Sequence, residues 1–595
     1  MTNGPAACGS STSPRPPAIS WRPCVRHTDP PARHSLSDWT VVLPYWRSHE
    51  KWAPLAMLAT IVGLSFIYVR TAVWFGRWNQ QFFDAMFAYR VETCLWLLPP
   101  YIAVCVLSSG CYVLQTYLTQ VLSMRWRLWN TRVYLRRYLS DTAYYRMEHG
   151  TATGDNPDQR IADDLSQMTV LSLRMALDGI QAVTTLLSFS IVLWEIGGSI
   201  DMSWSGHHLR VSGYLLLGTI LATLGASILM EKMGSPLIEA DYRQQHFDAD
   251  LRAALIDMRR NSEQIAFSRG EDAENLRLSH YLRTIAHNWR SVVTYTWRAN
   301  FVGDLFNGTA SIILWVLLLP KLVAHALTFG EYSRINAAFM QVRRSLQWFM
   351  NNYTDLATLR SVMQRLHEFE RTVSLPPRTR ITHIDTPAPG LDIRDLVLHH
   401  PDGRQLLHIP ALHVDGGERW LVRGASGTGK STLLRAIAGL WEHGHGTITL
   451  DRGNCMFLPQ RTYLPHGSLR AVLSYPHAAC SHDDARYEAV LHTVNLDACA
   501  ARLDEEAQWD TILSPGEAQR IAMARVLLQR PGMLFMDEAT SALDDENTRR
   551  IHAALLAALP HMTIISISHH ERDRAFHPHE LRLADGRALF LPPPP

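Results

Sequence analysis

The feature that most constrains this chain is a glycine-rich loop between a short apolar run and a helical pattern. The apolar run is Trp420–Val422, and the helical pattern covers Leu433–Ala438. In such a context, backbone N–H groups and a helix N-terminus surround a phosphate group. The loop consists of Gly424, Ala425, Ser426, Gly427, Thr428, Gly429, Lys430, Ser431 and Thr432. We expect Lys430 to reach the β- and γ-phosphates of a nucleotide and the Ser431 hydroxyl to coordinate Mg²⁺.

A second strand pattern ends in two acidic residues. The apolar run Met533–Met536 is followed directly by Asp537 and Glu538. An aspartate at the end of a buried strand can hold Mg²⁺ through its water shell, and the adjacent glutamate can polarise an attacking water. Asp537 lies about a hundred residues after Lys430, which is a usual separation in phosphate-loop hydrolases. The two patterns together predict nucleotide hydrolysis.

Three further segments place polar residues at the ends of apolar patterns. Ser514–Gln519 opens a helical pattern, and a helix N-terminus offers N–H groups to a phosphate. Taken alone, this segment could equally be a helix cap. Gln460 follows a short strand pattern, and His569 follows the run Thr563–Ser568. A single Gln or His is usually structural, so these two residues gain weight only from the whole set.

The first half of the chain contains uncharged apolar blocks that are long enough to cross ~30 Å of hydrocarbon. Clear examples are Trp52–Val69, Thr93–Met124 and Val211–Met230. Gly179–Trp194 and Leu305–Pro320 are borderline in length. One such block is often a buried core helix, but five blocks in one half of a chain indicate a membrane domain.

A sixth crossing is needed if the N-terminus and the nucleotide site lie on the same side, and Glu331–Asp355 is the candidate. Wound as a helix, this segment separates polar from apolar side chains. The polar face holds Arg334, Gln341, Arg344, Ser345, Asn351, Asn352 and Asp355, with Ala337 and Trp348 among them. An arginine at the bilayer centre costs about 2.5–3.5 kcal/mol, so we expect this face to line protein or water. An amphipathic cytosolic helix is the alternative that periodicity leaves open.

Composition and charge suggest the domain boundaries. Residues 1–35 are rich in Pro, Ser and Arg without an apolar segment, which is typical of a disordered tail and not of a signal peptide. The arginine-rich stretches 125–174 and 232–298 are expected on the cytoplasmic side. We therefore expect a transmembrane domain over 36–365, a proline-containing linker over 366–390 and a nucleotide-binding domain over 391–591. The expected spans are about 52–74, 94–118, 176–198, 211–231, 300–320 and 331–355.

The soluble segments together resemble the nucleotide-binding domain of the ATP-binding cassette (ABC) superfamily in order and spacing. Residues 424–432 are similar to its Walker A motif, and residues 533–538 to its Walker B motif with the catalytic glutamate. The other similar segments are Gln460 for the Q-loop, Ser514–Gln519 for the signature motif, Ser541–Asp544 for the D-loop and His569 for the switch histidine. Pro515 stands where glycine is commoner in the signature motif.

The resemblance implies roles that the local patterns leave undecided. Gln460 and His569 would assist Glu538 in catalysis, and Gln460 would also reach Mg²⁺. The nucleotide would in addition be contacted by Ser514, Gly516, Gln519 and Asp544. The adenine-stacking aromatic of many members would fall near His400, and an imidazole stacks less broadly than a larger ring.

The membrane half resembles one branch of the superfamily. Residues 155–161, 261–271 and 459–470 are similar to motifs of bacterial fused permease/ATPase proteins for peptide, bleomycin or cobalamin uptake. Eukaryotic relatives of that branch are the peroxisomal acyl-CoA half-transporters of subfamily D. The resemblance implies an all-α six-helix transmembrane domain of the exporter type, followed by an α/β P-loop NTPase cassette.

The implied function is transport across a membrane, driven by hydrolysis of ATP with Mg²⁺. One chain carries one set of motifs, so a homodimer with two ATP molecules at its interface is implied. The expected partners are a second copy, the lipid bilayer and a transported polar or anionic small molecule or peptide, but no nucleic acid. The expected location is the bacterial inner membrane, with the nucleotide domain in the cytoplasm.

Two other classes of function remain open at this point. A soluble ABC ATPase acting on ribosomes or DNA is disfavoured by the apolar blocks before residue 321. A membrane-anchored regulator whose ATPase gates a channel would share all of the motifs. The direction of transport and the cargo do not follow from the sequence.

Overall fold

The computed structural model describes residues 39–149, 156–204, 207–323, 325, 327–375, 379–387, 389–479 and 481–591. The expected tail over residues 1–35 lies outside the described residues. The chain divides into two compact units, which are described separately. Unit 1 comprises Met1–Arg127 with Ser166–His367, and unit 2 comprises Leu128–Leu165 with Glu368–Pro595.

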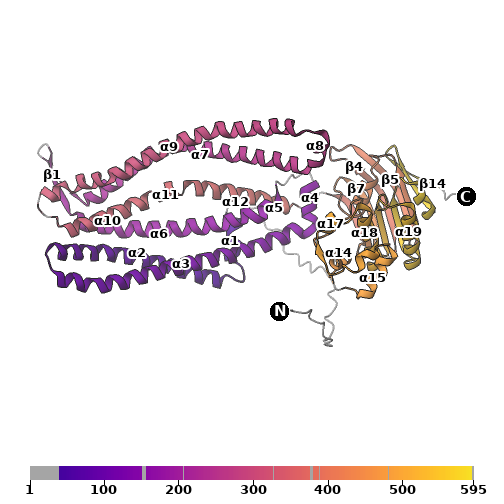
Figure 1. Ribbon diagram of the computed structural model, residues 1–595, viewed down its shortest axis with the longest axis horizontal. Coiled ribbons are helices and arrows are strands. Elements are labelled where there is room, and N and C mark those ends of the chain that lie inside the picture. The colour runs from indigo at the N-terminus through magenta and orange to yellow at the C-terminus, as the bar shows by residue number, and fades with distance from the viewer. Residues whose placement is uncertain are drawn as a thin grey trace, which may run out of the picture. The chain divides into compact units, whose positions relative to one another are not determined.

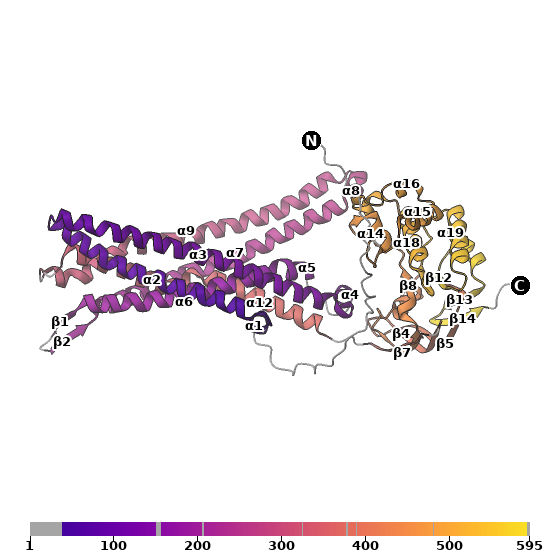
Figure 2. The same ribbon diagram turned by 90° about the horizontal axis from the view of Figure 1, so that it is seen from below.

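Unit 1 is built almost entirely from long helices (Figures 1 and 2). In chain order the helices are α1 (Trp39–Trp46), α2 (Trp52–Phe87), α3 (Val91–Leu139), α6 (Leu165–Gly197), α7 (Tyr214–Arg260), α8 (Ser262–Ser268), α9 (Glu271–Val323), α10 (Phe329–Leu346), α11 (Trp348–Asn351) and α12 (Tyr353–Val373). An antiparallel hairpin of β1 (Ser199–Trp204) and β2 (His207–Ser212) joins α6 to α7. Helices α3 and α12 continue into unit 2.

Among the described residues, five helical stretches are long and apolar enough to cross a membrane: 52–87, 91–149, 157–197, 214–260 and 271–323. Helices suit this role because every backbone N–H and C=O between their ends is paired within the element, away from water. Each stretch extends well beyond its apolar block, and α7 and α9 together contain most of the arginine-rich stretch 232–298.

The single helix expected over 331–355 is divided into α10, α11 and α12. The helices are separated at Gln347 (φ −78°, ψ −6°) and Asn352 (φ −110°, ψ 9°), where the backbone angles shift away from those of a regular α-helix. The Asn352 amide donates to the Trp348 carbonyl at 2.8 Å, a local side-chain bond that competes with regular helix. Amphipathic periodicity cannot reveal such a break, because the hydrophobic pattern continues across it.

The apolar face of α10 packs inward as the periodicity predicts. Ile335, Ala338, Phe339 and Val342 are buried with residues of α6, α7 and α9. Burying side chains of this size stabilises the packing by roughly 1.5–3 kcal/mol each for the larger ones. On the opposite, polar face, Arg334 donates to Gln80 of α2 at 3.0 Å, whereas Gln341, Arg344 and Ser345 line a cavity.

Unit 2 contains a ten-stranded sheet with the order β3-β7-β4-β5-β14-β13-β6-β12-β11-β8. The strands are β3 (Arg380–Asp385), β4 (Gly390–His399), β5 (Gln405–Asp415), β6 (Arg419–Gly424), β7 (Gly444–Leu450), β8 (Cys455–Leu458), β11 (Met533–Asp537), β12 (Thr563–Ile567), β13 (His579–Ala584) and β14 (Arg587–Leu591). β8, β11, β12, β6 and β13 are mutually parallel. The carboxyl ends of these strands therefore meet at one edge of the sheet.

The remaining elements of unit 2 are short or amphipathic. They are η1 (Ser140–Thr142), α4 (Ala143–His149), α5 (Pro157–Gln159), η2 (Arg160–Asp164), α13 (Lys430–Ile437), η3 (Arg452–Asn454), β9 (Gly467–Ser468), α14 (Leu469–Ser474), α15 (Asp484–Thr493), α16 (Asp497–Ala500), β10 (Glu506–Ala507), α17 (Trp509–Ile512), α18 (Pro515–Gln529), α19 (Asp545–Ala558) and η4 (Glu571–Phe576). β9 and β10 pair as a separate small sheet.

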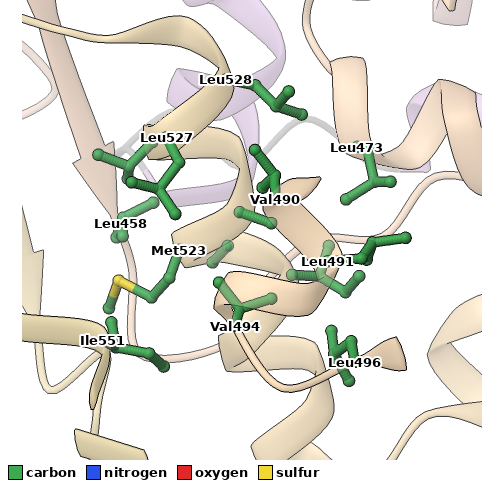
Figure 3. Packing of buried hydrophobic residues seen from close by; sticks show 14 of the residues in the cluster. Leu458, Leu473, Val490, Leu491, Val494, Leu496, Met523, Leu527, Leu528 and Ile551 are labelled. Atoms are coloured by element: carbon green, nitrogen blue, oxygen red, sulfur yellow. The ribbon is translucent and has the colours of Figure 1, made fainter. Parts of the chain in front are cut away.

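Strand β11 is buried on both faces, which explains its uninterrupted apolar run. Met533 and Phe535 belong to the cluster shared with β4, β5 and α13, whereas Leu534 and Met536 belong to the cluster under α15, α18 and α19. Figure 3 shows the second cluster, where side chains of α15 and α18 meet Leu458 and Ile551. A central parallel strand covered on both sides reads as a continuous hydrophobic segment.

The stretch 366–390 is more ordered than the linker expected from its prolines. Helix α12 continues to Val373, and β3 pairs in parallel with β7 from Arg380 opposite His445 to Asp385 opposite Leu450. Residues 376–378 and 388 lie outside the described part. Prolines disfavour helices and central strands, but they permit an edge strand. The edge strand β3 forms because it pairs with β7, which lies far from it in the sequence.

Candidate functional site

The glycine-rich loop connects β6 to α13 at the carboxyl edge of the parallel strands. Gly427 (φ 83°) and Gly429 (φ 93°) adopt left-handed conformations that side chains disfavour. A Cβ atom at Gly424 would lie 2.6 Å from the Leu583 carbonyl oxygen, so strand β13 also requires glycine there. The loop therefore presents its backbone N–H groups and the N-terminus of α13 to a common space, as an anion site requires.

The Lys430 ammonium group folds back into the loop. Its Nζ donates to the carbonyl oxygens of Gly424 and Ala425, both at 2.9 Å, and the residue is 7% exposed. Burial lowers the pKa of Lys430, although the nearby carboxylates of Glu538 and Asp537 act in the opposite direction. A buried cation beside a ring of N–H donors favours a polyanionic ligand.

Ser431 and Asp537 are brought together from elements more than a hundred residues apart. The Ser431 hydroxyl donates to Asp537 Oδ1 at 3.2 Å. The pairing of β11 with β12, and of β12 with β6, places the end of β11 beside the loop. A hydroxyl and a carboxylate oxygen at this spacing are hard donors of the kind that Mg²⁺ accepts.

The Glu538 carboxylate is shared by Gln460 and His569. Gln460 Nε2 donates to Glu538 Oε2 at 2.9 Å, and His569 Nε2 lies 3.4 Å from Glu538 Oε1. β8 and β12 flank β11 on either side, so Gln460 and His569 approach the end of β11 from its two neighbouring strands. A carboxylate held by two neighbours in this way suits a group that takes a proton from a water molecule.

Glu538 itself has an unusual backbone conformation. Its φ of 51° is left-handed, which costs about 1–3 kcal/mol for a residue with a side chain. The conformation is held by hydrogen bonds from Glu538 N to the Ile567 carbonyl (3.0 Å) and from Gln519 Nε2 to the Glu538 carbonyl (3.4 Å). Strain of this kind is concentrated at functional sites.

The segment Ser514–Gln519 forms the first turn of α18. Ser514 and Glu517 make a reciprocal capping box, and the hydrogen bonds from Ser514 lower the pKa of Glu517. Gln519 is buried and binds residues 538, 541 and 542. Within the described chain, no hydrogen bond of Ser514 or Gln519 goes to 424–432, so this part of the expected site is not assembled with the loop in one copy.

Asp544 and His400 also lie in local structures of their own. Asp544 caps α19 by accepting from Asn547 N at 2.7 Å, and that hydrogen bond lowers the pKa of Asp544. His400 closes a tight turn with Arg404 and Gly403. Leu406 reaches the loop more closely, since its Cγ would lie 3.0 Å from a Cβ at Gly429. Because Leu406 is apolar, the sequence patterns did not indicate that it lies beside the loop.

Arg572 is a further residue that the sequence patterns did not indicate. Its guanidinium donates to the carbonyl oxygens of Thr540 (3.1 Å) and Leu543 (2.9 Å), and it pairs with Asp545 (2.5 Å). Arg572 lies three positions after His569 in the chain. It therefore ties the segment that follows β12 to the segment that follows Glu538. Only its proximity to His569 in the sequence could have drawn attention to it.

The residues of this edge fit a nucleoside triphosphate with Mg²⁺. The loop and the buried Lys430 suit the phosphates, the oxygens of Ser431 and Asp537 suit the metal, and Glu538 suits the attacking water. This fit rests on groups from four separate segments of the chain, namely the loop, Gln460, the end of β11 and His569.

Comparison with known proteins identifies both halves of the chain. Residues 40–323 match the family "ABC transporter transmembrane region 2", and residues 407–541 match the family "ABC transporter". An uncharacterized ABC transporter ATP-binding protein of Synechocystis sp. is 34% identical over 516 residues, which cover 84% of this chain and 75% of that protein.

Other relatives match over most of their length. The inner membrane ABC transporter ATP-binding protein YddA of Escherichia coli is 29% identical over 88% of this chain and 93% of that protein. ABC transporter D family member 2, chloroplastic, of Arabidopsis thaliana is 28% identical over 90% of this chain and 84% of that protein. The relation to subfamily D that the membrane motifs suggest is thereby confirmed.

A solved structure shows the same fold. A bacterial Atm1-family ABC exporter with ATP bound superposes with a TM-score of 0.69 at 19% identity, covering 90% of this chain and 94% of that one. The expected fold class, a helical exporter-type domain followed by an α/β nucleotide-binding domain, is confirmed. The chain therefore belongs to the ABC transporters with fused transmembrane and ATP-binding domains, and it hydrolyses ATP to drive transport across a membrane.

Proposed function

We propose that this chain works as a homodimeric half-transporter with two composite ATP sites. Each chain supplies a transmembrane domain over about 36–365 and a nucleotide-binding domain over about 391–591. The observation that carries the proposal is the convergence of Lys430, Ser431, Asp537, Gln460 and His569 around Glu538. These groups provide phosphate binding, metal ligands and a base in one place.

In this mechanism the loop N–H groups and Lys430 bind the β- and γ-phosphates. Lys430 exchanges its carbonyl partners for phosphate oxygens, which removes the cost of its burial. Ser431, Asp537 and Gln460 would hold Mg²⁺, and the bound ion would neutralise phosphate charge. Glu538 accepts a proton from the attacking water, while Gln460 and His569 keep its carboxylate oriented.

The second copy completes the site. The contacts of Ser514, Gly516 and Gln519 lie within α18 and with residues 538–542 of the same chain. Among the described residues, none of the three forms a hydrogen bond with the glycine-rich loop of its own chain. The N-terminus of α18 nevertheless remains a phosphate-facing surface. A face-to-face dimer brings this surface, with Asp544, against the loop of the partner. ATP then joins the two cassettes, and hydrolysis releases them.

We place the protein in the bacterial inner membrane, with the cassette in the cytoplasm. The long arginine-rich extensions and the likeness to the inner membrane protein of E. coli support this location.

His400 is proposed to stack on adenine. The cargo is proposed to be polar or anionic because Arg334, Gln341 and Arg344 form a polar stripe on α10.

Two substitutions test the ATP site. Glu538→Gln should lower ATP turnover by about 10²–10⁴-fold while ATP binding is retained, because only the base is lost. Lys430→Ala should instead weaken ATP binding itself, because the phosphate contact is lost. Turnover and nucleotide affinity are measured on the full-length protein in lipid nanodiscs. Normal turnover of the Glu538 variant would overturn its assignment as the base.

A further inference from the structure

A buried hydroxyl group holds the turn that carries His569. Ser568 follows β12 directly, precedes His569 in the chain and is 4% exposed. Its Oγ accepts the N–H of His570 at 3.1 Å, a side-chain bond that closes a turn around His569. The side chain of His569 is half exposed and lies beside Glu538. One oxygen atom therefore contacts the backbone that follows His569 and belongs to the residue that precedes it.

Asp573, at 2% exposure, fixes the orientation of this hydroxyl. Ser568 Oγ donates its proton to Asp573 Oδ2 at 2.5 Å. With the proton directed at the carboxylate, a lone pair of the same oxygen is left for the N–H of His570. A hydrogen bond to an ionised acceptor is about twice as strong as one between neutral groups. The carboxylate therefore stabilises the turn through the hydroxyl.

His577 attaches the far end of the same segment to β12. Its buried ring places Nδ1 2.7 Å from the Asp573 carbonyl oxygen and Nε2 2.8 Å from Ser566 Oγ. Because a carbonyl oxygen can only accept, Nδ1 carries the proton and Nε2 accepts from the Ser566 hydroxyl. Burial lowers the pKa of His577, which agrees with a neutral ring. Residues 568–577 are thus bound at both ends to buried partners.

Stability alone is a poor explanation for the Asp573 carboxylate. Within the described part of the chain, its second oxygen, Oδ1, is buried without a hydrogen-bond partner, and Arg572 Nε lies 4.0 Å from it. A buried carboxylate with an unsatisfied oxygen destabilises a fold relative to an apolar side chain. A buried group of this kind therefore calls for a reason other than packing.

We propose that Ser568 and Asp573 are positioning residues for His569, because they fix the turn from which its imidazole reaches Glu538. The inference rests on the proposed function, in which His569 keeps the Glu538 carboxylate oriented. His569 Nε2 lies 3.4 Å from Glu538 Oε1, at the long end of hydrogen-bonding distances. A small displacement of the turn is enough to remove this contact, so hydrolysis depends on how firmly the turn is held.

Ser568→Ala tests the proposal by removing a single oxygen atom. We expect kcat for ATP to fall about tenfold or more, because small misplacements in a catalytic site are costly. The KM for ATP should stay within about twofold, since the phosphate-binding loop is untouched. Ser568→Thr keeps the hydroxyl and should keep most of the activity. Both are measured by steady-state ATPase assays on the full-length protein in lipid nanodiscs.

A double-mutant cycle shows whether Ser568 acts through His569. The double change Ser568→Ala with His569→Ala should be no slower than His569→Ala alone, because both remove the same contact with Glu538. Asp573→Ala should reduce kcat as Ser568→Ala does, and it should likewise have no further effect when His569 is absent.

Ser474→Ala is the matched control. The Ser474 hydroxyl is buried in α14 and lies 2.5 Å from the Tyr487 hydroxyl, with no printed contact to residues 568–577. Its removal should lower the melting temperature about as much as Ser568→Ala does, but it should leave kcat unchanged. The comparison separates loss of a buried hydroxyl from loss of position at His569.

Three results would overturn the inference: normal kcat in Ser568→Ala, single-variant losses that multiply in the double variant, or an equal loss of kcat in Ser474→Ala. Its failure is distinguishable from failure of the proposed function. Normal turnover of Ser568→Ala beside a slow His569→Ala would refute only the positioning role. Normal turnover of His569→Ala would refute the proposed role of His569 and this inference with it.

Discussion

At the scale of single residues, His552 should make the stability of the cassette depend on pH. It is 2% exposed and stacks on Phe576 with the ring centroids 4.2 Å apart. Burial, assisted by the neighbouring His577, lowers the pKa of His552 to about 4. The unfolded chain, with a histidine pKa of about 6.5, therefore binds more protons between pH 6.5 and 4. Stability should fall by about 2–3 kcal/mol over this window as the pH is lowered.

The measurement is the apparent melting temperature of the full-length protein between pH 7.5 and pH 4. His552→Gln should flatten the part of the profile below pH 6.5, because glutamine does not titrate. His561→Gln, at an exposed position, is the matched control and should leave the profile unchanged. An unchanged profile in His552→Gln would show that other groups cause the acid sensitivity.

At the scale of elements, Arg572 should position the segment after Glu538. Its guanidinium links η4 to Thr540, Leu543 and the first residue of α19, Asp545. Removing charged hydrogen bonds of this kind costs about 1.5–3 kcal/mol each. Arg572→Ala should therefore lower kcat for ATP about tenfold or more with a smaller change in KM, because the loop that binds phosphate is untouched.

Steady-state ATPase kinetics test this expectation, with Asp545→Asn as the comparison. That change weakens the ion pair but leaves the two carbonyl acceptors in place, so its effect should be smaller than that of Arg572→Ala. A variant Arg572→Ala that raises KM while kcat stays unchanged would contradict a positioning role. Recovery of kcat in Arg572→Lys would show that charge alone is sufficient.

At the scale of the whole molecule, composite sites predict complementation between copies. Ser514→Asp keeps the cap of α18, because aspartate is a good N-cap, but it adds a carboxylate where phosphate would approach. Ser514→Asp and Lys430→Ala should each inactivate the homodimer. A mixed dimer of the two variants retains one site with an intact loop and an intact α18 terminus, and it should recover a substantial fraction of one site's ATPase.

The mixed dimer is isolated through two different affinity tags and assayed in nanodiscs. Ser514→Asn, which caps without charge, is the matched control and should retain most activity. A mixed dimer as inactive as its parents would show that loop and α18 act within one copy, and it would refute the homodimeric arrangement.

The sequence by itself determined the elements that bind phosphate. Residues 424–432 and 533–538 are contiguous, so strand, loop and helix patterns reveal them without knowledge of the rest of the chain. Apolar blocks likewise predicted the membrane helices, because bilayer thickness fixes their length. The break at Asn352 and the edge strand β3 escaped prediction, since each depends on a local or distant hydrogen bond that periodicity does not record.

Only the tertiary structure decided which side chains meet. Gln460 and His569 reach Glu538 because β8 and β12 flank β11, an order that the sequence does not state. The contacts of Arg572 join residues from several elements in the same way. Contiguous motifs can be recognised from local sequence patterns. The meeting of side chains from distant segments depends on strand order and helix packing, which arise only when the whole chain folds.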